Sequence, residues 1–166
     1  MSEHEGTPST LAFLIHDDEV LLGIKQKKVG AGLYNGYGGK VEEQDGGDIE
    51  KTMVRETEEE IAVTPTEYQK IAEVQFHNPL DDARLGKMYV HVYLVTEWQG
   101  EPTDSDEMRG LEWFKRNEVP YGSMLKSDAW WLEKVLGGGT WKASVKYDKD
   151  WNFIESESTI EQVEKL

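Results

Sequence analysis

The chain has 166 residues, a length that suits one domain around one hydrophobic core. Its formal net charge of −15 argues against general affinity for nucleic acid, whose backbone binds basic surfaces. The chain has no cysteine, so it can form neither disulfide bonds nor thiolate metal sites, and charges interrupt every apolar run before it reaches the length of a membrane span.

The N-terminal part of the chain predicts a tail, a hairpin and a loop. Residues 1–9 are polar and acidic, without the apolar stretch of a signal peptide, so we expect a flexible tail on a cytoplasmic protein. The apolar runs 11–15 and 20–24 predict two strands that pair through a turn at residues 17–18. Residues 29–39 are rich in glycine and aromatic residues, which predicts a loop with exposed backbone.

The middle of the chain predicts a helix followed by strands. The helix is expected over residues 48–61, with Asp48 as its N-cap and Pro65 preventing its continuation. A polar loop is expected over residues 78–86. Strands are predicted from their apolar content at residues 68–76, 87–98 and 110–114.

The C-terminal part predicts a second helix and a hairpin. Residues 127–136 form the predicted helix, which the glycines at 137–139 stop. Alternation then indicates a half-buried antiparallel strand, whose inner face is Trp141, Ala143, Val145 and Tyr147. Residues 151–155 are expected to pair with this strand through a turn at 148–150. The whole chain, residues 1–166, is therefore predicted to be one α/β domain with a mixed sheet and two helices.

Three glutamates of the first predicted helix are the main candidates for chemistry. Glu56, Glu59 and Glu60 stand at i, i+3 and i+4, so their carboxylates share one helix face. Three close like charges repel one another, and a divalent cation reverses that repulsion; Mg²⁺ prefers such oxygen ligands. A solvated acidic helix face is the alternative interpretation, and composition alone favours it.

The residues around the glutamates favour the metal site. Arg55 directly precedes them and is expected to fix one carboxylate through a bidentate ion pair. Gly38 and Gly39 allow backbone carbonyls to approach the same metal without side-chain overlap. No single part of this pattern is specific for a metal site. The ordered combination of a strand, a Gly-Gly loop and an acidic helix is more specific.

With these residues the chain resembles the Nudix family. The Nudix motif has Gly, five residues, Glu, seven residues, Arg-Glu, an aliphatic residue, any residue, Glu-Glu, any residue, Gly and an aliphatic residue. The matching positions are Gly39, Arg55, Glu56, Glu59, Glu60 and Val63. The resemblance implies a Nudix-type α/β/α sandwich and a hydrolase that needs Mg²⁺, with Mn²⁺ as a possible substitute.

The motif departs from the family pattern at several positions. The gap between Gly39 and Arg55 is two residues longer than in the pattern, so that the first Glu, counted back from Arg55, falls at Gly47. Glu43 and Asp45, in the lengthened loop, are the two candidates to replace that carboxylate. Thr57 and Ala62 stand at the positions of the aliphatic residue and the late Gly.

Most of the chain resembles the mammalian MutT homologues, which hydrolyse oxidised purine nucleoside triphosphates such as 8-oxo-dGTP to the monophosphate and pyrophosphate. The carrying segments are residues 20–23, 30–41 and 105–109, the last followed by Trp113-Phe114. The resemblance implies that Glu107 assists the metal site. It also implies a nucleotide pocket formed by Thr10, Lys25, Asn35, Phe76, Met88, Met108, Ser127, Asp128 and Trp131.

Two of the implied pocket positions differ from the subfamily. An Asp pair that reads the base there is Ser127-Asp128 here, and a Trp that stacks on the base is Leu125. Each implied residue also has an ordinary structural interpretation, such as a turn residue for Asn35, a helix cap for Ser127 and plain core for the strand residues.

The resemblance leaves the proton acceptor open among four glutamates, the three of the helix and Glu107. It implies a small nucleotide as the only partner of a monomeric protein. Two other hypotheses remain, because Leu125 and Ser127 alter the pocket and Gly47 lacks the carboxylate. The first is a Nudix enzyme for another nucleotide, such as an alkylated or unmodified dNTP or a nucleotide sugar. The second is a catalytically weak module that only binds.

Overall fold

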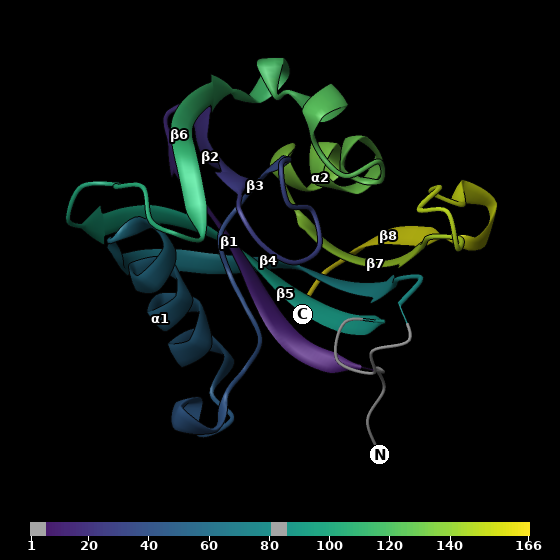
Figure 1. Cartoon of the computed structure of the whole chain (residues 1–166), viewed down its shortest axis with the longest axis horizontal. Coiled ribbons are helices and arrows are strands. Elements are labelled where there is room, and N and C mark those ends of the chain that lie inside the picture. The colour runs from purple at the N-terminus through teal and green to yellow at the C-terminus, as the bar shows by residue number, and fades with distance from the viewer. Residues whose placement is uncertain (1–5, 81–85) are drawn as a thin grey trace.

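A computed structural model describes residues 6–80 and 86–166, which fold around a mixed sheet of eight strands (Figure 1). The strands are β1 (Thr7–His16), β2 (Glu19–Lys25), β3 (Tyr34–Asn35), β4 (Thr64–His77), β5 (Lys87–Gln99), β6 (Met108–Lys115), β7 (Thr140–Lys146) and β8 (Thr159–Val163). Their order is β3-β2-β1-β5-β4-β7-β8, and β6 pairs with β2. The helices are α1 (Ile49–Ile61) and α2 (Asp128–Leu136), with short 3-10 turns at Glu43–Asp45, Arg116–Glu118, Tyr121–Ser123 and Glu155–Glu157.

The sheet separates two hydrophobic clusters, one under each helix. Along β1 successive side chains point to opposite faces, so Phe13 and Ile15 join the cluster that contains α2 residues. Ala12 and Leu14 join the cluster that contains Met53 of α1. This alternation confirms the predicted α/β/α sandwich, and β7 and β8 extend the sheet beyond β4.

Local signals in the sequence placed the first hairpin and the first helix correctly. β1 and β2 pair in an antiparallel arrangement around Asp17, whose φ of 53° is a left-handed conformation that Asp tolerates. The Asp48 carboxylate caps α1 by accepting a hydrogen bond of 3.2 Å from the Lys51 amide. Pro65, by contrast, lies within β4, since the helix already ends at Ala62.

Two of the sequence predictions are wrong and two fall on undescribed residues. β1 begins at Thr7, so Thr7–Ser9 are strand rather than tail, while residues 1–5 of that prediction lie outside the described part. Likewise residues 81–85 of the predicted polar loop are not described. The predicted strand 151–155 is reduced to a bridge between Tyr147 and Phe153.

The cause of the missing strand is the Asp148 carboxylate. It accepts hydrogen bonds from the amides of Asp150 and Asn152, which curls the chain into a turn with Trp151 at a φ of 60°. The strand that pairs with β7 in antiparallel orientation is therefore the later β8, and β7 also lies parallel to β4.

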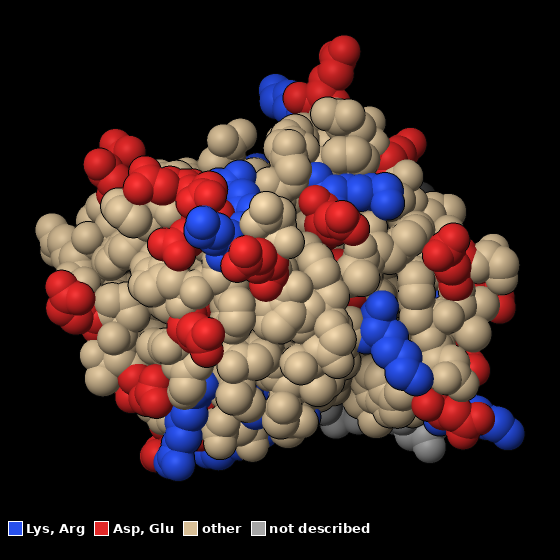
Figure 2. All heavy atoms as spheres, turned by 90° about the horizontal axis from the view of Figure 1, so that it is seen from above, with Lys and Arg blue, Asp and Glu red and all other residues tan. Residues whose placement is uncertain are grey.

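Charge is distributed over the surface without segregation on the face shown in Figure 2. Among the described residues visible there, Lys and Arg side chains lie scattered between Asp and Glu rather than in one basic patch. No helix in the described ranges, 6–80 and 86–166, is long and apolar enough to span a membrane.

Ala62 offers a test of how α1 ends. It occupies the left-handed C-cap with a φ of 64°, a conformation that costs a residue with a Cβ about 1 kcal/mol. We expect Ala62→Gly to raise the free energy of unfolding by about that amount in urea denaturation. Ala129→Gly, at an exposed position inside α2, is the control and should lower it by about 0.5–1 kcal/mol. Destabilisation by both changes would contradict the strain at Ala62.

Candidate active site

A cavity of about 530 Å³ opens on the sheet and collects most of the predicted site residues. Those that line it are Thr10, Lys25, Asn35, Gly38, Gly39, Glu56, Glu59, Glu60, Phe76, Met88, Glu107, Asp128 and Trp131. Of the remaining predictions, Arg55 lies behind the glutamates, and Met108 and Ser127 are fully buried away from the cavity lining.

Three carboxylates form one group at the acidic end of this cavity. Oxygens of Glu56 and Glu60, one helical turn apart on α1, and of Glu107, just before β6, all lie within 4.8 Å of one another. Glu56 and Glu60 are only 8% and 3% exposed, whereas Glu107 is exposed. Glu59 is not part of this group, although it lines the same cavity.

Burial makes the ionised form of these carboxylates unfavourable. Burial, and after it the neighbouring Glu56, raises the pKa of Glu60 to about 8. Burial also raises the pKa of Glu56, against the opposing effect of the Arg55 guanidinium. Two buried carboxylates with a third in reach fit a hard divalent cation, because such a cation supplies the charge that the buried oxygens lack.

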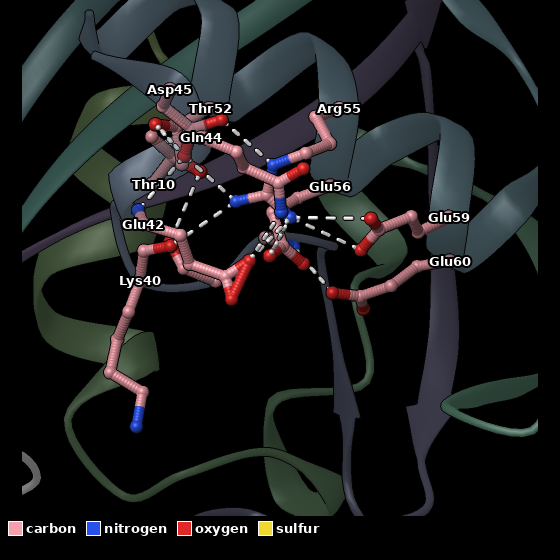
Figure 3. A network of polar contacts seen from close by, with 12 residues as sticks. Thr10, Lys40, Glu42, Gln44, Asp45, Thr52, Arg55, Glu56, Glu59 and Glu60 are labelled. Carbon is pink, nitrogen blue, oxygen red and sulfur yellow. Dashed lines mark hydrogen bonds and ion pairs between the residues drawn. The ribbon is translucent and has the colours of Figure 1, made fainter. Parts of the chain in front are cut away.

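Arg55 connects the acidic helix to the loop before it (Figure 3). Its Nε and Nη2 donate to the two carboxylate oxygens of Asp45 at 2.8 and 2.9 Å. Its Nη1 donates to Glu56 at 2.9 Å and to Glu59 at 3.2 Å. The predicted bidentate pair therefore exists, but with the loop carboxylate, while a single nitrogen orients the two helix glutamates.

Asp45 occupies the place of the motif's first carboxylate. It is the sixth residue after Gly39, as the family pattern requires when counted forward, whereas counting back from Arg55 reaches Gly47. The two additional residues are Gly46 and Gly47, whose φ values of 59° and 80° suit glycine. Of the two candidates in the loop, Asp45 is therefore the one that contacts Arg55.

Further donors hold Asp45 in its ionised form. The Thr52 hydroxyl and the Glu42 amide donate to its Oδ2 at 2.8 and 2.9 Å, in addition to Arg55. Arg55, the strongest of these influences, holds the pKa of Asp45 well below its usual range. Asp45 is buried, whereas Glu43 is exposed on the same turn.

Gly38 and Gly39 let the loop pass close to α1 and β1. A Cβ on Gly38 would overlap the Thr10 carbonyl, and one on Gly39 would overlap the Glu56 carboxylate. The Gly38 amide donates to Glu60 at 3.2 Å, and the Gly39 carbonyl accepts from the Thr10 amide at 2.9 Å. The close approach expected of the glycine pair is therefore present, and its contact with a metal remains a prediction.

A second part of the lining, the apolar end, consists of Phe76, Met88, Leu125 and Trp131 together with the polar side chains of Asn35 and Asp128. The side-chain oxygen Oδ1 of Asn35 accepts a hydrogen bond from the Gly36 amide at 2.8 Å. Asp128 is buried, and its two oxygens accept from Trp131 Nε1 and the Leu125 amide, each at 3.1 Å. Burial raises the pKa of Asp128 to about 7. At neutral pH its carboxyl can therefore either donate or accept a hydrogen bond.

The sequence interpretation missed several residues in the cavity wall, among them two lysines and a tyrosine. Lys27 and Lys28 line it beside Lys25, and their signal was a short basic run in an acidic chain. Tyr147 also lines it, from the start of the turn after β7. Its alternation with Val145 placed it correctly on the inner face, but nothing local connected that face with the site.

Comparison with known proteins shows the family. Residues 6–136 match the NUDIX domain, and the chain belongs to this family. The zebrafish Danio rerio protein named oxidized purine nucleoside triphosphate hydrolase is 37% identical over 127 residues, which are 76% of this chain and 78% of that protein. The Mus musculus protein of the same name is 34% identical over the same shares of both chains. A crystal structure of a MutT protein from Bacillus halodurans has a TM-score of 0.76 at 25% identity and covers 93% of this chain and 97% of its own.

The Asp45–Arg55 ion pair can be tested through stability. Asp45→Asn keeps the shape but removes a buried charge, so we expect the free energy of unfolding at pH 7 to fall by about 3 kcal/mol. Because folding lowers the pKa of Asp45 below its value of 3.8 in the unfolded chain, the difference should shrink as the pH falls below that value. Glu43→Gln is the control and should leave stability unchanged. Equal effects of both variants would refute the assignment.

Proposed function

We propose that the protein hydrolyses an oxidised purine nucleoside triphosphate, such as 8-oxo-dGTP, to the monophosphate and pyrophosphate. The group formed by Glu56, Glu60 and Glu107 is the observation that carries this proposal, because it lies in the same cavity as the polar pair of the apolar end. The names of the zebrafish and mouse relatives support the choice of substrate.

The acidic group would hold Mg²⁺, or Mn²⁺ in its place, through Glu56, Glu60 and Glu107. Bound there, the metal would neutralise phosphate oxygens and stabilise the leaving pyrophosphate. Arg55 fixes the rotamers of Glu56 and Glu59, so these carboxylates keep their positions when charges approach. One of the four glutamates takes the proton of the attacking water, and the half-exposed Glu59 is the one outside the ligand group.

Lysines in the cavity wall reduce the repulsion between an acidic protein and a triphosphate. The Lys25 ammonium interacts with Glu60, Glu107 and Glu56. Lys27 and Lys28 line the same cavity and would meet phosphate oxygens that project from it. These cations explain how a chain with a net charge of −15 attracts this substrate.

The apolar end would hold the purine. Trp131 and Phe76 meet edge to face with their ring centroids 6.1 Å apart and provide an aromatic wall. Asn35 and Asp128 supply hydrogen bonds to the edge of the base. We also propose that the protein acts on free nucleotides in the cytoplasm. It would do so as a monomer, without a nucleic acid partner.

Glu60→Gln tests the catalytic role of the acidic group. We expect kcat for 8-oxo-dGTP hydrolysis to fall by at least about 100-fold, measured by pyrophosphate release at saturating Mg²⁺. Glu58→Gln changes an exposed residue of the same helix that bonds to Thr64, and it should retain full activity. Activity of Glu60→Gln equal to that of Glu58→Gln would refute the mechanism, and absence of turnover in the wild type would favour a binding module.

A substrate panel tests the base preference. Leu125 stands where the subfamily has a stacking Trp, so dNTPs, their oxidised and alkylated forms and nucleotide sugars should be compared by kcat/KM. We expect the oxidised purine triphosphates to exceed the unmodified ones by about tenfold or more, as one well-placed hydrogen bond in a buried site provides. A nucleotide sugar as the best substrate would overturn the proposal.

A further inference from the structure

Tyr147 reaches the cavity from a part of the chain beyond the family match. The NUDIX match ends at residue 136, and Tyr147 directly follows β7. Its ring lines the cavity with Asp128 and Trp131, yet its hydroxyl is buried behind them against the start of α2. The C-terminal extension of the sheet therefore contributes to the wall at the apolar end.

The Tyr147 hydroxyl makes two hydrogen bonds to one residue. It accepts from the Ser127 amide at 2.9 Å and donates to the Ser127 hydroxyl at 2.7 Å. Ser127 is fully buried and does not cap α2 with its own side chain. An amide in the first turn of a helix needs an acceptor, and here the phenol from another strand supplies it.

Ser127 directly precedes Asp128, so the same bonds fix the backbone from which the Asp128 carboxyl group extends. The Asp128 side chain has its own partners, the Leu125 amide and Trp131 Nε1. Both belong to the same short segment as Ser127, one before it and one after it in the chain. The Tyr147 hydroxyl thus connects this segment to the sheet at the residue next to Asp128.

The position of Tyr147 is itself fixed. Its amide donates to the His77 carbonyl of β4 at 3.0 Å. The rings of Trp151 and Phe153 pack against its own, with centroids 5.4 and 6.2 Å away. A fixed backbone and a ring packed against two aromatic neighbours give the hydroxyl a defined place.

We propose that Tyr147 is a positioning residue for base recognition: through Ser127 it orients the Asp128 carboxyl toward the purine and so determines which purine the cavity prefers. This inference rests on the proposed function for the identity of the ligand. The effect of Tyr147 would concern binding of the base at the apolar end of the cavity, and not the acidic group.

The test compares Tyr147→Phe with Tyr121→Phe. The first removes only the hydroxyl that bonds to Ser127, while the second removes a buried hydroxyl that has no hydrogen-bond partner among the described residues. Calorimetry gives the Kd of the reaction products 8-oxo-dGMP, dGMP and dAMP for each protein. We expect Tyr147→Phe to raise the Kd of the tightest purine about tenfold and to reduce the ratio between purines, with KM changed more than kcat. Ser127→Ala should have a smaller effect, because it keeps the hydrogen bond from the backbone amide of residue 127 to the Tyr147 hydroxyl.

The outcomes separate this inference from the proposed function. A lower melting temperature of Tyr147→Phe with unchanged Kd ratios would mean a structural role only and would overturn the inference, as would equal effects of Tyr121→Phe. If the wild type binds purine monophosphates but hydrolyses no triphosphate, the proposed function fails while the Kd comparison still decides the role of Tyr147. Absence of purine binding by the wild type would overturn both.

Discussion

The site depends on the repulsion between Glu56 and Glu60, two carboxylates held close together out of water. Nothing in the helix requires them to be buried, and burial makes their ionised forms costly. Two neighbouring cations reduce the cost of ionising these carboxylates. Arg55 places a guanidinium beside Glu56, and the Lys25 ammonium attracts all three carboxylates of the group, yet the pKa values of Glu56 and Glu60 stay raised. A divalent cation would offset the remaining cost, and we therefore propose that a metal completes the acidic group.

The fold brings together parts that are far apart in the chain to build the cavity. α1 supplies the acidic end, and the glycine loop passes against it so closely that a Cβ would not fit. The apolar end comes mainly from β4, β5 and the start of α2, with Asn35 of β3 and Tyr147, just after β7, beside them in the lining. Because the two ends belong to different elements, the metal chemistry and the choice of base can vary separately.

The sequence predicted what local chemistry determines. The Asp48 cap, the first hairpin and the shared face of the helix glutamates follow from short patterns, and all are present. Features that depend on contacts between residues far apart in the chain could not be predicted from such patterns. The contact between Asp45 and Arg55 could be recognised only from the conformation of the loop. Counting along the motif forward from Gly39 reaches Asp45, whereas counting back from Arg55 reaches Gly47. The link between Tyr147 and Ser127 joins residues 20 positions apart, and β8 was displaced by a turn that one carboxylate stabilises.

Thermal unfolding with and without Mg²⁺ tests the central claim most directly, with Glu60→Gln as the matched variant. In the folded protein the pKa of Glu60 is raised from 4.5 to about 8, so without metal the stability of the wild type should fall as the pH rises between these values. Glu60→Gln should show a smaller loss, because the raised pKa values of Glu56 and Asp128 contribute to it in both proteins. Mg²⁺ at pH 8 should raise the melting temperature of the wild type far more than that of the variant. A wild-type melting temperature that responds neither to pH in this range nor to Mg²⁺ would contradict the account.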